Sequence, residues 1–136
     1  MTTEDQSVQK THLSISEELV GKVVKVETGV YAEVTLTVNE KMKADQKGLI
    51  HGGFTFGLAD YAAMVAVNDP FVVLLASDVR FLKPVVIGDR LTARARISPT
   101  EGRKQKVSCD VINQNQEKVL GGEFLCMTLD KHVLER

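Results

Sequence analysis

The sequence predicts an α+β fold in which one long, buried helix is wrapped by a curved antiparallel sheet. A nearly unbroken apolar run follows Gly53 and stops at Asn68-Asp69-Pro70. This run is too long for an ordinary strand, and its Ala, Met and Leu residues favour helix. Segments of alternating apolar and polar residues lie on both sides of the run, and the later ones are joined by short turns, which indicates antiparallel neighbours.

The apolar run predicts a helix from about His51 to Val67, because a residue before proline avoids helical geometry. Since the run is apolar nearly all round, the helix should be buried. Asp60 is the exception within it. An unpaired charge in apolar surroundings costs several kcal/mol. Asp60 is therefore either a structural residue, at solvent or in a buried hydrogen bond, or a carboxylate kept for chemistry.

Six strands are expected around this helix. They lie at Lys22–Glu27, Val30–Val38, Phe71–Leu82, Leu91–Ile97, Val107–Val111 and Val119–Leu129. In the first strand we expect Val24 and Val26 on one face. The third is β-branched and long enough for a central strand, and Gly121-Gly122 suggests a bulge in the last. A short helical turn is expected at 14–20, capped by Ser14 or Ser16, and a turn is expected at 98–102.

Length and composition suit a single globular domain spanning residues 1–136, with mobile ends at 1–12 and 131–136. The 43% hydrophobic and 26% charged residues argue against disorder, and a net charge of -1 gives no basic field for nucleic acid. No apolar run suits a membrane span, and the acidic start is no signal peptide, so we expect a cytoplasmic protein. Cys109 and Cys126 lack metal-ligand spacing and are expected as buried free thiols. No metal or cofactor is expected.

The stretch His51-Gly52-Gly53, where the loop becomes the helix, is a candidate site. The first amides of a helix have no internal partner, and the helix dipole makes this end positive. Such a site suits a carbonyl oxygen that becomes negative during acyl transfer. Asp60 lies two turns later, within reach only if it belongs to a second subunit or if the substrate lies along the helix. His51 is either a structural hydrogen-bonding residue or a proton-transfer group.

Two further groups of residues are candidates for substrate contacts. Arg103 and Lys104, in an expected hairpin turn, either meet phosphates of a nucleotide-like group or are solvated surface charges. The aromatic and Met side chains of the helix are either core or pocket lining, namely Phe54, Phe56, Tyr61 and Met64.

Two blocks of the sequence carry a family signature. They are Gly48-x-x-His51-Gly52-Gly53-x6-Asp60 and Phe81-Leu82-Lys83-Pro84-Val85-x2-Gly88-Asp89. Together they resemble the hotdog-fold acyl-CoA thioesterases of the PaaI-like branch, over roughly residues 20–130. The resemblance implies the hotdog fold, a long helix wrapped by an antiparallel sheet. It also implies a homodimer, often paired into a homotetramer, with shared active sites, so that Asp60 of one subunit faces Gly53 of the other.

The resemblance also implies roles for single residues. Asp60 matches the general base or nucleophile, the Gly53 amide polarises the thioester carbonyl, and His51 lies near the thioester. Asp45 stands where the family often has Asn, so a second carboxylate there would raise the pKa of Asp60 or repel an acidic acyl tail. Leu74 stands where the family often has Ser or Thr, although Ser77 lies nearby. Substrate contacts are expected from Gly52, Phe54, Tyr61, Arg103 and Lys104.

The activity implied by the resemblance is hydrolysis of an acyl-CoA or related thioester to free acid and thiol. The alternative is a non-catalytic domain on the same fold that binds or senses acyl-CoA. A hydratase or dehydratase would need a catalytic Asp/His pair at a different spacing and ranks last. The expected partners are an acyl-CoA substrate and further copies of the chain, without nucleic acid or membrane. The sequence leaves the acyl length open.

Overall fold

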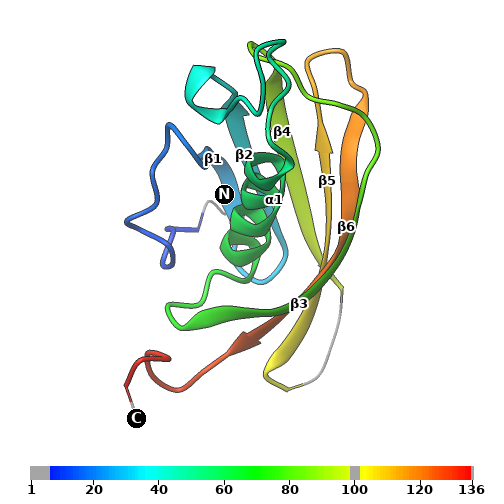
Figure 1. Cartoon of the computed structure of the whole chain (residues 1–136). Coiled ribbons are helices and arrows are strands. Elements are labelled where there is room, and N and C mark those ends of the chain that lie inside the picture. The colour runs from blue at the N-terminus through cyan, green and yellow to red at the C-terminus, as the bar shows by residue number, and fades with distance from the viewer. Residues whose placement is uncertain (1–6, 99–101, 136) are drawn as a thin grey trace.

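The computed structural model describes residues 7–98 and 102–135. A six-stranded antiparallel sheet curves around helix α1 (Gly52–Val67), as Figure 1 shows. The strands are β1 (Lys22–Glu27), β2 (Tyr31–Thr37), β3 (Val72–Phe81), β4 (Arg90–Ser98), β5 (Lys104–Ile112) and β6 (Lys118–Thr128), and a 3₁₀ turn, η1 (Glu40–Met42), precedes the helix. Their order across the sheet is β1-β2-β4-β5-β6-β3. The predicted hotdog fold is confirmed.

Helix α1 is buried along most of its length, as its apolar sequence predicts. His51 is its N-cap, and Asn68, in the left-handed region at φ 53, is its C-cap. Alternate residues of the sheet face the helix, and those of β2, β4 and β5 are almost inaccessible to solvent, including Ala32, Val34, Leu36, Leu91, Ala93, Ala95, Val107, Cys109 and Val111. The period-two patterns therefore identified the inner face of these strands correctly.

The first strand and the turn before it differ in detail from the prediction. The pairing of β1 with β2 shifts register between Val23 and Lys25. This bulge turns Val24 outward, where its side chain is 48% exposed, and Val23 packs against the core in its place. Ser16 does cap its turn, because its hydroxyl oxygen accepts a hydrogen bond from the Leu19 N–H at 3.2 Å.

Strand β3 is an edge strand, so the expectation of a central strand is wrong. Hairpins make β4, β5 and β6 neighbours and β4 pairs with β2, which leaves β3 only β6 as a partner. The bulge expected at Gly121-Gly122 is not at these two residues, which pair regularly. The last strand bulges instead at Val119, where its pairing with β5 shifts register, and β3 shifts register between Leu74 and Ala76. Gly122 allows β3 to lie close to β6, since a β-carbon on Gly122 would be 2.3 Å from the Asp78 carbonyl oxygen of β3.

The described part of the amino-terminal segment, which we expected to be mobile, is hydrogen bonded to the body of the molecule. The Lys10 N–H donates to Asn68 Oδ1 at 2.7 Å, and the Gln9 side-chain amide donates to the Tyr61 hydroxyl at 2.9 Å. Residues 1–6, residues 99–101 of the turn expected at 98–102, and residue 136 lie outside the described residues. Within residues 7–98 and 102–135, no helix has the length and apolarity needed to cross a membrane.

Candidate active site

The two blocks that carry the resemblance meet at the amino end of α1. The His51 N–H donates to the Met42 carbonyl oxygen at 3.0 Å, and the Ile50 N–H donates to the Val85 carbonyl oxygen at 2.8 Å. An isolated bridge between Leu49 and Val86 adds a second link. The segment before the helix is therefore pinned to the loop that follows β3, which brings both blocks to one place.

The first amides of α1 are open. His51 makes no side-chain capping bond, and the first turn holds no acidic residue. The Phe54 N–H donates to the His51 carbonyl oxygen at 3.1 Å, but among the described residues no acceptor is found for the N–H groups of Gly52 or Gly53. Two donors at the positive end of the helix dipole thus remain free for an oxygen that carries negative charge.

His51 stands exposed beside these amides. Its ring packs edge-on against Phe54, with 6.1 Å between the ring centroids. Within residues 7–98 and 102–135 its ring nitrogens form no hydrogen bond, so the ring is not fixed by a side-chain partner. Phe54 is half-buried and lies beside His51.

Asp60 lies in the middle of α1 and is poorly solvated. Its Oδ1 atom is buried and has no hydrogen-bond partner among the described residues. Burial raises the pKa of Asp60 to about 6. The charge of Asp60 in turn adds to the burial that raises the pKa of the Cys126 thiol to about 12, so the carboxyl faces β6 at this level. Burial therefore destabilises the charged form of Asp60 relative to its protonated form.

The free amides and Asp60 do not face one another within one chain. Asp60 follows Gly53 by seven residues, which is about 10 Å along the helix axis. The free N–H groups point out of the amino end, away from the body of the helix that carries Asp60. A single thioester carbon therefore cannot contact both groups of the same helix.

The Asp45 side chain stabilises its own loop. Its carboxylate accepts hydrogen bonds from the N–H groups of Lys47 at 2.9 Å and Leu49 at 3.2 Å, and its side chain is exposed. Burial is the cause of the raised pKa of Asp60, and Asp45 makes no contribution to it. The repulsion expected between these two carboxylates is therefore not found within one chain.

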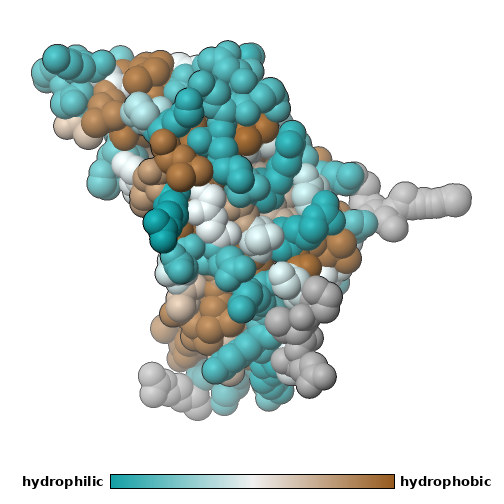
Figure 2. Space-filling model, turned by 90° about the vertical axis from the view of Figure 1, so that its right-hand side faces the viewer, coloured by the Kyte–Doolittle hydropathy of each residue, from teal (hydrophilic) through white to brown (hydrophobic). Residues whose placement is uncertain are grey.

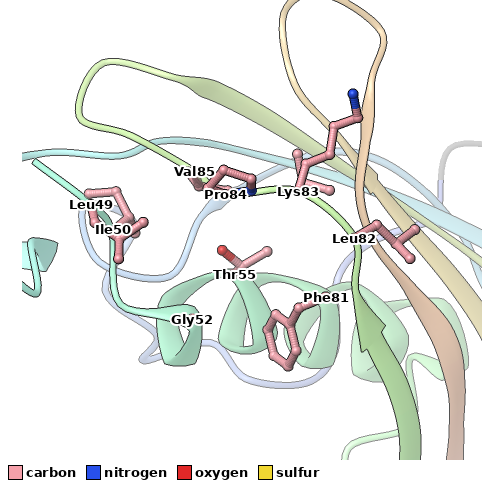
Figure 3. A pocket seen from close by; sticks show the side chains of 10 residues that line it. Leu49, Ile50, Gly52, Thr55, Phe81, Leu82, Lys83, Pro84 and Val85 are labelled. Carbon is pink, nitrogen blue, oxygen red and sulfur yellow. The ribbon is translucent and has the colours of Figure 1, made fainter.

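An apolar groove, called here the entrance groove, opens beside the amino end of α1 (Figure 3). Gly52 and Thr55 of the helix line it, with residues 49–50 on one side, residues 81–85 on the other and Val119 behind. Its volume is about 340 Å³, within the range of small-molecule sites. The sequence did not single out Thr55 or Leu49, because only the meeting of the two distant segments makes them neighbours.

Three of the predicted substrate contacts lie elsewhere in the chain. Tyr61 is buried and points to the amino-terminal segment through its bond with Gln9. Arg103 is paired with Asp130, and Lys104 is exposed at the start of β5. Both lie at the β4–β5 turn, which Figure 1 places at the opposite end of the sheet from the amino end of α1. In the part of the chain described, no group of three or more His, Cys, Asp and Glu side chains is arranged to hold a metal.

The fold places the chain among the hotdog-fold proteins of the thioesterase superfamily, of the PaaI type. The family model of the thioesterase superfamily matches residues 47–120, and the chain belongs to that superfamily.

Solved structures of related proteins agree with this assignment. An uncharacterized protein from Pyrococcus horikoshii is 52% identical, with a TM-score of 0.93 over 97% of this chain and 100% of that one. The PaaI protein of the phenylacetic acid degradation operon of Escherichia coli is 28% identical, with a TM-score of 0.74 over 82% of this chain and 80% of that one. A hypothetical thioesterase from Streptococcus pneumoniae, solved with coenzyme A, shares the fold at 21% identity and a TM-score of 0.72, over 82% of this chain and 87% of that one.

Curated relatives carry other names and are longer. The methylthioribose-1-phosphate isomerase of Aquifex aeolicus is 52% identical over 88% of this chain, which corresponds to 26% of that protein. The transcription factor FapR of Caldanaerobacter subterraneus is 22% identical over 97% of this chain and 66% of its own length. The chain thus spans about a quarter of the first relative and slightly less than two thirds of the second.

Proposed function

We propose that this protein hydrolyses an acyl-CoA or related thioester to a free acid and a thiol. The observation that carries the proposal is Asp60, a half-buried carboxyl whose Oδ1 atom is buried and has no partner among the described residues, on the same helix whose first amides are free. Helix-end amides suit the developing oxyanion of a thioester, and a carboxyl whose pKa is about 6 is largely ionised, and hence basic, at neutral pH.

In the proposed reaction, the thioester carbonyl oxygen accepts hydrogen bonds from the Gly53 N–H and the neighbouring Gly52 N–H. Asp60 either takes a proton from the water that attacks the carbonyl carbon or attacks that carbon itself. The carbon–sulfur bond then breaks, and the thiolate leaves and takes up a proton. Where Asp60 attacks, water then hydrolyses the mixed anhydride, which releases the free acid and restores the carboxylate. His51 and Phe54 lie beside the thioester. Because thioesters of coenzyme A are the proposed substrates, we also propose a cytoplasmic location.

The separation of the amides from Asp60 leads us to propose a homodimer with shared sites. We propose that the two subunits pair through edge strand β3, because its outer edge has no partner strand among the described residues. Figure 2 shows the molecule from the right-hand side of Figure 1, with apolar patches within a mostly polar surface. Leu75, in this strand, is 47% exposed.

The charges of β3 suggest the register of this pairing. Asp78 lies opposite Glu123 of β6, and like charges directly opposite are unfavourable. If β3 of two subunits pair antiparallel about an axis through Val79, Asp78 would face Arg80 of the partner subunit. The Leu74 end of β3, which pairs with Cys126 and is level with Asp60, would then lie beside the partner's loop 82–85. In this arrangement, Asp60 of each subunit would lie near the free amides of the other subunit. Pairs of such dimers would give the homotetramer common in the family.

The test is thiol release from a panel of acyl-CoAs, followed over time for the parent and for Asp60→Asn. The Asn variant keeps the shape of the side chain but cannot accept the proton or attack the carbon. We expect its kcat to fall by orders of magnitude while its affinity for acyl-CoA remains, because the group acts in the transition state. An Asn variant that turns over at the parental rate would exclude Asp60 from the chemistry.

A second candidate function is acyl-CoA sensing without turnover. The relatives named as transcription factors favour it. The same panel separates the two functions, because a sensor binds acyl-CoA, seen by calorimetry, and releases no thiol. Arg103, Lys104 and Tyr61 would contact ligand in either case only through a partner subunit or a moved segment.

A further inference from the structure

The entrance groove is apolar and is left uncovered in the chain. Three of its lining side chains are large, apolar and well exposed: Phe81 at 58%, Leu82 at 50% and Leu49 at 40%. Single exposed apolar residues are common on proteins, but a cluster around a hollow marks a surface that another apolar group covers. This hollow begins at Gly52, beside the free amides.

The charges around the groove restrict what covers it. Lys83 is the one ionisable side chain in its lining, and its ammonium group is paired with Glu117 at 3.2 Å. In Figure 3 this ammonium points away from the helix and out of the groove. No free charge in the lining is thus left to meet an anionic group, so the groove suits an uncharged hydrocarbon.

We propose that the entrance groove holds the hydrocarbon chain of the acyl group, and that Phe81 sets the chain length accepted. The proposal rests on the proposed thioester function and names its substrate class, straight-chain acyl groups without a terminal charge. With the carbonyl oxygen at the Gly52 and Gly53 amides, the α-carbon and the carbons beyond it enter the groove between Thr55 and residues 81–85.

Phe81 is the residue suited to this role because its backbone is held by strand pairing while its side chain is exposed. It ends β3, where it pairs with Leu120, and the next N–H, of Leu82, donates to the Val119 carbonyl oxygen at 2.8 Å. The ring lies against Gly52, since a β-carbon on Gly52 would be 3.2 Å from its Cε1 atom. The size of the side chain at position 81 therefore determines how far the groove stays open beside the amides.

The experiment measures kcat/KM of the full chain for saturated acyl-CoAs from acetyl to palmitoyl. For the parent we expect kcat/KM to rise about fourfold with each added methylene, which corresponds to about 0.8 kcal/mol, until the groove is full. Phe81→Ala should move the best substrate to longer chains, and Phe81→Trp should move it to shorter ones. Val86→Ala is the matched control, because Val86 is apolar and 47% exposed nearby but does not line the groove.

Three outcomes would overturn the proposal. The first is the same order of chain lengths for all variants, and the second is an equal loss at every length. The third is a shift of chain length that appears only where Phe81→Ala also changes the oligomeric state, seen by sedimentation, because Phe81 lies on the strand proposed to pair between subunits and the shift would then come from the altered dimer. If the parent hydrolyses no acyl-CoA, the proposed function fails, but calorimetry still tests the groove. A chain-length preference in binding that shifts with the Phe81 variants would support it even then, and one that does not shift would exclude it.

Discussion

The imidazole ring of His51 lies against Gly53, so closely that no side chain fits between them. A β-carbon on Gly53 would be 2.8 Å from Nε2 and 2.9 Å from Cδ2 of the ring. Any residue other than glycine at this position must therefore displace the ring. Because the ring is exposed and has no hydrogen-bond partner among the described residues, it can move. The imidazole and the free amide of Gly53 thus occupy one small volume at the amino end of α1.

The contact between His51 and Gly53 provides a matched pair of variants that test the role of the Gly53 N–H. Gly53→Ala and Gly53→Pro both displace the His51 ring, but only Pro removes the N–H. Proline is tolerated in the first turn of a helix, where the N–H has no helical partner. We expect Gly53→Pro to lose about 10²–10³-fold more kcat than Gly53→Ala, as for one oxyanion donor. Equal kcat values in two folded variants, measured by thiol release with circular dichroism as the fold check, would remove the Gly53 amide from the mechanism.

The raised pKa of Asp60 predicts how stability depends on pH. Its pKa is about 6 in the folded chain, against an ordinary value of 3.8 for this carboxyl. Between these values the folded state binds more protons than the unfolded state, so the free energy of unfolding falls as pH rises from about 4 to about 6. Two pKa units set an upper limit of about 3 kcal/mol, and the solvent that reaches this half-buried carboxyl makes the effect smaller.

Asp60→Asn removes this effect, since Asn does not ionise. We therefore expect its melting temperature to equal or exceed that of the parent at pH 7, and to depend less on pH between about 4 and about 6. Thermal unfolding at several pH values checks this. Should the Asn variant melt well below the parent at pH 7, the ionised carboxylate holds the fold or the dimer together, and its role is structural.

The same carboxyl predicts how activity depends on pH, with kcat/KM falling on the acid side of the profile, its acid limb. As a base or nucleophile Asp60 works only when ionised, so kcat/KM should rise through a pH near 6. Asp45→Asn should leave this limb in place, because Asp45 does not contribute to the pKa of Asp60 and an Asn oxygen still accepts the loop bonds from Lys47 and Leu49. A limb displaced to lower pH would show that Asp45 of the partner subunit lies near Asp60.

The features of the fold that depend on neighbouring residues could be predicted from the sequence, and those that depend on distant residues could not. Helix α1 was predictable to within a residue, because composition and the Asn68-Asp69-Pro70 stop act over short range. The inner faces of β2, β4 and β5 followed from their alternation. The position of β3 at the edge of the sheet could not be predicted, because it depends on which strands the hairpins bring together. The outward orientation of Val24 could not be predicted either, because one bulge in β1 causes it.

The candidate site shows the same division. Asp60 stood out because a carboxylate breaks an apolar run, and the free amides follow from the helix start alone. The entrance groove could not be predicted, since residues 49–50 and 81–85 become neighbours only through the bonds between the two loops. Asp45 was assigned to chemistry because of its place in the motif, whereas its hydrogen bonds within the loop became visible only in three dimensions.

Strand β3 yields the last prediction, which concerns the dimer. In the proposed register Asp78 and Arg80 of one subunit face Arg80 and Asp78 of the other, so each dimer holds two opposite-charge pairs. Asp78→Arg alone would place like charges opposite one another twice. Cross-strand pairs contribute about 0.2–1 kcal/mol each, so the dissociation constant should rise about tenfold. Arg80→Asp alone should weaken the dimer in the same way, through facing carboxylates.

The double variant Asp78→Arg/Arg80→Asp restores both opposite-charge pairs and should recover the parental dissociation constant, measured by sedimentation over a range of concentrations. Because Asp60 of one subunit is proposed to serve the amides of the other, thiol release should fall with the dimer in the single variants and return in the double one. If instead the single variants dissociate and keep full activity per chain, the site is not shared. If the double variant stays as weak as the single ones, the two subunits do not pair through β3 in this register.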